Sequence, residues 1–121
     1  MTQLKKNNYN TFSNSLLSWY DFNRRILPWR APQGKISNPY FVYLSEIMLQ
    51  QTVVKTVIPY FLKFVRKWPD INALAKAELH EINSYWAGLG YYNRAKNFFT
   101  LNRKISRIIN NLCHIKCHFC I

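Results

Sequence analysis

One stretch decides how this chain folds, Ser45-Glu46-Ile47-Met48-Leu49-Gln50-Gln51-Thr52, and it closes an apolar helical run that starts at Tyr40. The chain has only five acidic residues, and Glu46 is the one set among apolar neighbours. On a helix, Val42 and Leu49 lie beside it, because residues three and four positions apart share a face. Such a carboxylate either finds a partner or has its pKa raised by desolvation, and a raised pKa suits a general acid near neutral pH. An exposed or capped glutamate at the helix edge is the alternative.

Two glutamines follow this carboxylate at the expected end of the helix. Gln50 and Gln51 each carry an amide that both donates and accepts hydrogen bonds. Paired amides at a helix end are suited to reading the polar edges of a binding partner. We therefore expect both glutamines at a binding surface.

Composition and charge narrow the class of protein. The chain has 121 residues, 49% of them hydrophobic and 17% aromatic, which favours one packed domain or part of one. Its formal net charge of +12 indicates a polyanionic partner, either nucleic acid or a membrane surface. No apolar run approaches the roughly 18–20 residues of a membrane span, and residues 1–10 lack a signal-peptide pattern. We expect a cytoplasmic protein.

The hydrophobic periodicity predicts an all-α fold, since no segment alternates with a period of two. We expect a polar tail over 1–10, a helical domain over 11–109 and a divergent Cys-rich tail over 110–121. The predicted helices are 11–25, 39–50, 53–65, 71–77, 78–86 and 91–109. The expected N-caps are Thr11 or Ser13, Asn38 with Pro39 at the first helical position, Thr52, and Asp70. Pro59 predicts a kink or an early break in the third helix.

Two further motifs place cations beside aromatic rings. Arg24-Arg25-Ile26-Leu27-Pro28-Trp29-Arg30 offers forked donors for phosphates or base edges and a ring for stacking. Gly88-Leu89-Gly90-Tyr91-Tyr92-Asn93-Arg94 sets rings at a flexible turn, from which a ring can wedge between bases. The alternatives are a solvated basic turn with Trp29 in the core, and a helix start whose tyrosines fill the core.

The three cysteines, Cys113, Cys117 and Cys120, all lie in the last nine residues beside two histidines. Thiolate and imidazole could hold zinc or an iron–sulfur cluster, and the spacing also matches the radical-SAM cluster motif. We expect no metal site here, because nothing follows the motif that could complete it.

Taken in order, the motifs resemble a known family. Leu27-Pro28-Trp29-Arg30, Ser45 to Thr52, Val57-Ile58-Pro59-Tyr60-Phe61 and Gly88 to Ala95 are similar, in sequence and spacing, to MutY-type adenine DNA glycosylases of the helix-hairpin-helix superfamily. The resemblance covers about residues 12–109 and implies the N-terminal helices of a six-helix barrel domain. It also implies an enzyme of base-excision repair that hydrolyses the N-glycosidic bond of adenine opposite 8-oxoguanine or guanine in double-stranded DNA.

The resemblance implies a role for particular residues. Glu46 matches the catalytic glutamate that protonates the flipped-out adenine. Positions that line the adenine pocket are matched by Arg25, Leu27, Trp29 and Arg30. Residues that contact the opposite, oxidised base are matched by Leu49, Gln51 and Thr52, and Gln50 joins them as a DNA-binding residue. Tyr91 matches the residue wedged beside that base.

The chain also departs from the family's pattern. An oxocarbenium-like sugar needs a second carboxylate, which the family supplies as an aspartate after a Gly-rich hairpin, yet no Asp, Glu or Gly follows Arg107 here. The ligands of the family's 4Fe-4S cluster have no match either, so we expect no cofactor in this chain. We expect a truncated product, its last residues out of frame, with little or no turnover. A non-enzymatic basic DNA-binding remnant is the alternative, and a metal-binding tail in an unrelated role is a third hypothesis.

Overall fold

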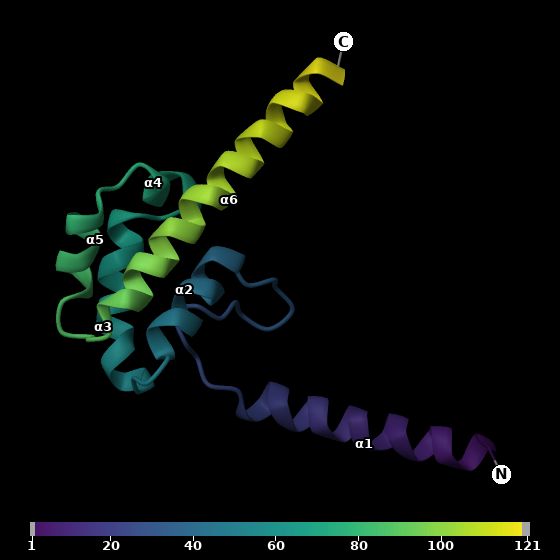
Figure 1. Cartoon of the computed structure of the whole chain (residues 1–121). Coiled ribbons are helices and arrows are strands. Elements are labelled where there is room, and N and C mark those ends of the chain that lie inside the picture. Colours follow the sequence, from purple (N-terminus) through teal and green to yellow (C-terminus); the bar gives the residue numbers. More distant parts are fainter. Residues whose placement is uncertain (1, 120–121) are drawn as a thin grey trace.

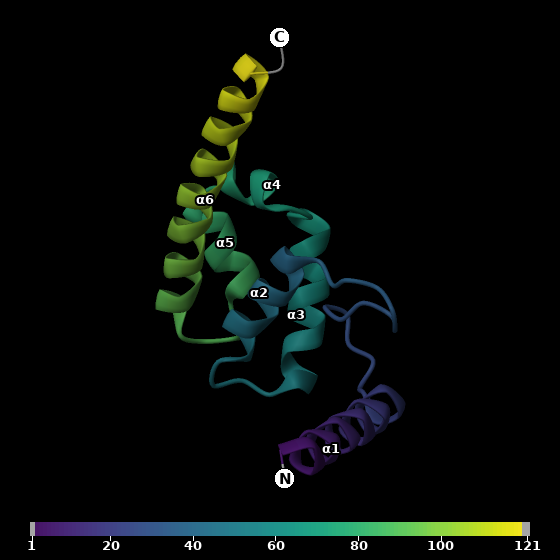
Figure 2. The same cartoon turned by 90° about the vertical axis from the view of Figure 1, so that its right-hand side faces the viewer.

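The computed structural model describes residues 2–119, with side chains over 10–112, and is helical with short connections (Figure 1). Its elements are α1 (Thr2–Asn23), α2 (Pro39–Leu49), α3 (Val54–Lys67), α4 (Ile71–Ala75), α5 (Leu79–Trp86) and α6 (Tyr92–Phe119). The described residues contain no strand, which confirms the all-α prediction. Helices α2 to α5 gather around the first half of α6, while α1 extends away from them (Figures 1 and 2).

An aromatic core holds α2, α3, α5 and α6 together. Phe64 of α3 lies at its centre, with its ring 4.7 Å from that of Trp68, 6.1 Å from Trp86 and 6.2 Å from Phe98. Offset and edge-on ring pairs of this kind stabilise a core beyond the area that they bury. The fully buried side chains include Leu44, Met48, Val57, Phe61, Leu74 and Ile82. This core fixes the end of α2 relative to the start of α6.

Two helix starts follow the predicted capping chemistry, and a third has a cap that was not predicted. The Asn38 side chain accepts a hydrogen bond of 3.0 Å from the backbone N–H of Tyr40, and Pro39 stands at the first position of α2. Asp70 caps α4 by accepting from Ala73 N–H at 2.8 Å. At α5, Glu78 and Glu81 form a capping box. The caps predicted at Asn38 and Asp70 are confirmed.

The start and middle of α3 differ from the prediction. Its N-cap is Val53, which makes no side-chain capping bond, so Thr52 is not the cap. Helix α3 also runs on without a break through Pro59. A proline in a helix costs the hydrogen bond to the carbonyl four residues earlier, here that of Lys55. The side chains of Lys55 and Pro59 are exposed, so water can donate a hydrogen bond to the Lys55 carbonyl.

The two terminal helices are longer than predicted. Helix α1 begins at Thr2, so Thr11 and Ser13 lie inside it, and α6 continues past residue 109 to Phe119. Neither segment contains the Gly or Pro that would end a helix. Every described side chain of α1 is exposed, and Phe22 reaches 90%. The amphipathic helix predicted there forms, but its apolar side chains are not buried.

Within the described part of the chain, no helix combines the length and the apolar character needed to cross a membrane.

Candidate nucleic-acid interface

The turn that follows α2 brings three predicted site residues to the surface. Gln50 caps the helix end, Gln51 takes a left-handed backbone conformation with a φ of 60°, and the N–H of Thr52 donates to the Leu49 carbonyl at 3.3 Å. Both glutamines are exposed, whereas Thr52 and Leu49 are half-buried. A positive φ is uncommon for a residue with a side chain, and such residues concentrate at functional sites.

A second turn, between α5 and α6, presents Tyr91. Gly88 and Gly90 adopt φ values of 100° and 71°, and Tyr91 follows with a φ of 53°. Leu89 is buried and anchors the turn, while the Tyr91 side chain is 60% exposed. The N–H of Arg94 donates to the Tyr91 carbonyl at 2.9 Å as α6 begins. The sequence prediction of a ring at the tip of a turn is therefore met.

Arg94 joins these two turns. Its Nη1 donates to the carbonyl of Ile47 at 2.7 Å, to that of Met48 at 3.2 Å, and to that of Gln50. Its Nη2 lies 3.5 Å from the hydroxyl of Thr52. These acceptors include the last carbonyls of α2, which have no partner within the helix and carry its negative dipole end. The Arg94 side chain, at the start of α6, therefore caps the C-terminal end of α2.

The same guanidinium lies between two aromatic rings. Its central carbon is 5.2 Å from the centre of the Tyr91 ring and 5.9 Å from that of Trp86. Burial lowers the pKa of Arg94 from its ordinary value, although Tyr91 acts in the opposite direction. Arginine stays charged in proteins, so the contact is a cation–π interaction on both sides. We call this set of hydrogen bonds and ring contacts the Arg94 clamp. It was not predicted, because nothing local in sequence links Arg94 to the end of α2.

A pocket opens between the two turns. Its volume is about 560 Å³, and its lining comprises Gln50, Gln51, Tyr91, Tyr92, Asn93 and Arg94. Three residues proposed from sequence to contact DNA therefore lie around one hollow, although they come from two distant segments. Tyr92 and Asn93 were quoted in the motif but were not proposed as site residues. Their amide and ring add to the same surface.

Glu46 does not lie in the surroundings that we expected. Its side chain is exposed, and it forms no hydrogen bond or ion pair with the other described residues. The buried side of α2 carries Leu44, Ser45 and Met48, and the helical turn points Glu46 to the opposite side. The expectation of a carboxyl kept dry by this chain alone is therefore wrong.

The arginine-rich loop divides its residues between core and surface. Leu27 and Trp29 are buried, and the Trp29 ring packs edge-on against Phe61 at 5.1 Å. The structure therefore shows the alternative that we gave for this motif, in which Trp29 belongs to the core. Arg25 and Arg30 are exposed, and Arg30 lines a hollow with Arg24 and Asp21. Arg24 closes the loop by donating to the Ala31 carbonyl.

Helix α6 carries a basic face formed by Arg103, Lys104 and Arg107, which line a shallow pocket with Phe99 and Thr100. The Arg103 guanidinium lies 5.5 Å from the centre of the Phe99 ring. Among residues 10–112 no ion pair forms, so these cations have no acidic partner there. A row of unpaired cations along a helix suits a phosphate backbone.

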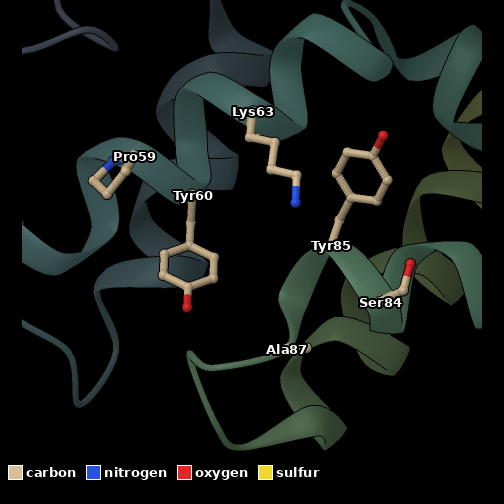
Figure 3. Close-up of a pocket in the computed structure, with 6 residues that line it drawn as sticks. All are labelled: Pro59, Tyr60, Lys63, Ser84, Tyr85 and Ala87. Atoms are coloured by element: carbon tan, nitrogen blue, oxygen red, sulfur yellow. The ribbon is translucent and has the colours of Figure 1, made fainter.

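A separate hollow lies between α3 and α5 (Figure 3). Lys63 extends into it, with its Nζ 4.9 Å from the centre of the Tyr85 ring, and Tyr60 stands on the other side. None of the residues proposed from sequence lines this hollow. It contributes nothing to the candidate interface.

The cysteine motif lies outside the described side chains. Over the described residues, no group of three or more His, Cys, Asp or Glu could hold a metal ion. The whole chain has three cysteines, whereas a four-cysteine iron–sulfur cluster needs four thiolates. The residues of this chain therefore do not fit the cluster of the resembled family.

Comparison with known proteins identifies the class. Residues 44–115 match the HhH-GPD superfamily of base excision DNA repair proteins, and the chain belongs to that superfamily. This span contains the α2 turn, the Tyr91 turn and the Arg94 clamp.

Its relatives narrow the resemblance. The chain is 43% identical over 102 residues to the adenine DNA glycosylase of Buchnera aphidicola subsp. Baizongia pistaciae, covering 84% of this chain and 28% of that protein. It is 47% identical over 98 residues to the human adenine DNA glycosylase, covering 78% of this chain and 18% of that protein. The mouse protein of the same name is 46% identical over 98 residues, covering 78% of this chain and 19% of that protein. The chain thus spans between 18% and 28% of the length of these relatives.

Proposed function

We propose that this chain is the DNA-engaging part of an adenine DNA glycosylase, which hydrolyses the N-glycosidic bond of adenine opposite 8-oxoguanine or guanine in double-stranded DNA. One observation carries the proposal: Gln50, Gln51 and Tyr91 line a single pocket, with Thr52 tied to it through Arg94. The relatives are named adenine DNA glycosylases, which supports adenine in DNA as the substrate, and the opposite base comes from the family resemblance.

The pocket suits a damaged base pair. The exposed Tyr91 ring projects from a turn fixed by buried Leu89, so it can enter between bases without reorganising the core. The amides of Gln50 and Gln51 can donate to and accept from the polar edge of the oxidised base. Thr52 and Leu49 would contact that base from the half-buried side of the turn.

On the adenine side, we assign Glu46 as the acid that protonates the leaving base. A general acid is most effective where water is excluded. Because Glu46 is exposed here, the flipped adenine and the rest of the site would have to exclude that water. Arg25 and Arg30, whose side chains are exposed, would contact the adenine nucleotide, while buried Leu27 and Trp29 would hold their loop in position.

We propose that the chain alone gives little or no turnover. The last acidic residue in the sequence is Glu81, so none follows that could serve as the aspartate stabilising the oxocarbenium-like sugar in the resembled family. Recognition of the damaged pair does not need that charge and is the property to test.

The test compares binding of the purified chain to a duplex with adenine opposite 8-oxoguanine and to a matched adenine–thymine duplex. We expect tighter binding to the damaged duplex, lost in Tyr91→Ala but kept in the control Tyr20→Ala, an exposed tyrosine of α1 that does not line the pocket. Equal affinity for both duplexes would contradict the proposal. A single-turnover assay with Glu46→Gln as control tests the chemistry, and strong cleavage that Glu46→Gln abolishes would refute the claim of low activity.

A non-enzymatic DNA-binding role is the second candidate, and the unpaired basic face of α6 favours it. Counterion release makes such binding weak and strongly salt-dependent. It predicts the same affinity for damaged and matched duplexes and no effect of Tyr91→Ala. An affinity that does not change with salt would exclude it.

A further inference from the structure

The two turns of the candidate interface are both held in an unfavourable backbone conformation. Gln51 and Tyr91 are the two non-glycine residues with positive φ among those described. Such a conformation costs free energy for a residue with a side chain and persists only where surrounding contacts impose it. The Arg94 side chain contacts both turns, through hydrogen bonds to the first and through the Tyr91 ring of the second.

The contacts of Arg94 connect the two turns. The guanidinium is planar and offers several donors in a fixed fork. One nitrogen reaches the carbonyls of Ile47, Met48 and Gln50, and the other reaches the Thr52 hydroxyl. Its face meanwhile contacts the Tyr91 ring. A lysine could supply the charge but neither the fork nor the flat face.

We propose that Arg94 is a positioning residue, which holds the 50–52 turn and the Tyr91 ring in the relative arrangement that the damaged base pair requires. Its nitrogens are occupied by the protein itself, apart from Nε, which is buried without a partner. Arg94 therefore acts through Gln51 and Tyr91, by forming the surface before DNA arrives. A preformed surface saves the ordering cost on binding and so increases selectivity for the duplex that fits it.

This inference rests on the proposed function for its DNA partner, but its first test uses no DNA. Hydrogen–deuterium exchange read by mass spectrometry follows peptides over 47–53 and 88–95 in wild type, Arg94→Met and Arg94→Lys. Both variants should exchange faster in these peptides, by about tenfold in Arg94→Met, as expected when charged hydrogen bonds that close a turn are lost. Peptides from α3 and α5 should be unchanged.

The chain offers a matched control in Arg103→Met. Arg103 lies on the same helix, contacts an aromatic ring at a similar distance and is exposed. Its removal takes away the same charge without touching either turn. Unchanged exchange of the 47–53 and 88–95 peptides in Arg94→Met would overturn the proposal. If Arg94→Met exchanges faster throughout, the charge-preserving Arg94→Lys decides: local opening supports the proposal, and wild-type exchange overturns it.

The second test measures selectivity as the ratio of affinities for the adenine–8-oxoguanine and adenine–thymine duplexes. In Arg94→Met the ratio should fall towards one, whereas in Arg103→Met both affinities should fall together and leave the ratio unchanged. A ratio as high in Arg94→Met as in Arg103→Met would overturn the role in recognition. If the wild-type ratio is already one, the proposed function fails, and the exchange measurement still decides whether Arg94 positions the turns.

Discussion

The Nη1 of Arg94 donates a hydrogen bond of 2.7 Å to the carbonyl of Ile47, a residue 47 positions earlier in the chain. The two residues thereby fix the end of α2 against the start of α6. The rings of Trp86, at the end of α5, and Tyr91 flank the same guanidinium. The candidate interface is thus built by a long-range contact rather than by either turn alone.

That contact should contribute to stability. Replacing Arg94 by Met leaves carbonyls at the end of α2 without their donor, which should cost about 1–3 kcal/mol. Thermal denaturation followed by circular dichroism should show a lower Tm in Arg94→Met than in the charge-matched Arg103→Met. Equal Tm values in the two variants would mean that water replaces the guanidinium at no cost.

Gly88 should not tolerate a side chain. Its φ is 100°, and a Cβ there would lie 2.0 Å from the hydroxyl oxygen of Tyr60. Gly34, with a φ of 79° and open space around it, is the matched control. Gly34→Ala should cost about 1 kcal/mol from backbone strain alone, and Gly88→Ala clearly more.

Gly88 and Tyr60 permit a double-mutant test. Tyr60→Phe removes the closest atom, although the ring carbon that carries it would still lie 3.1 Å from the added Cβ. In urea denaturation, Gly88→Ala should therefore be less destabilising in the Tyr60→Phe background than in wild type. The same loss in both backgrounds would show that strain, not the clash, limits this position.

Stability should fall at alkaline pH partly through Tyr40. Burial, with the charge of Asp70 second, raises the pKa of Tyr40 well above its ordinary value of 10.0, and its hydroxyl donates to the Trp68 carbonyl at 2.9 Å. The folded chain therefore holds this proton at a pH where the unfolded chain releases it. The contribution is full below about pH 10 and is lost as the pH rises further towards the folded-state value.

Thermal denaturation at several pH values between about 8 and about 11 checks this. Wild type should lose stability above about pH 10, and Tyr40→Phe should lose less, because the titrating group is gone. Burial also raises the pKa of Tyr43, so some alkaline loss should persist in the variant. Parallel curves for the two proteins would rule out the assignment to Tyr40.

The basic face of α6 should contribute to the salt dependence of DNA binding. Each phosphate contact contributes about 0.9 to the slope of log affinity against log salt. The triple variant Arg103→Gln, Lys104→Gln and Arg107→Gln should lower the slope for a matched duplex by up to about 3. The control triple Lys63→Gln, Arg66→Gln and Lys67→Gln removes as many charges from α3, and an equal reduction there would show that only net charge matters.

The sequence predicted what local chemistry determines. The caps at Asn38 and Asp70 and the turn at Gly88 and Gly90 depend on residues close in the chain, and the structure confirms them. The ends of α1 and α6 were misjudged, because loss of apolar periodicity does not end a helix in the absence of Gly or Pro.

The site was harder to predict because it depends on tertiary contacts. An apolar sequence around Glu46 suggested burial, yet packing turned that side of α2 outwards. Trp29 looked free to stack on a base, yet Phe61, more than thirty positions away, holds it in the core. The Arg94 clamp depends on the approach of two helices, which no local pattern encodes.

The absence of ion pairs among residues 10–112 has a practical consequence. Since no attraction between opposite charges in that region needs protecting, added salt acts there mainly by screening the mutual repulsion of excess cations. Concentrated chloride should therefore favour the compact state while stripping away nucleic acid carried over from the host cell. The chain should therefore be less stable in the dilute buffers suited to binding assays than in concentrated salt.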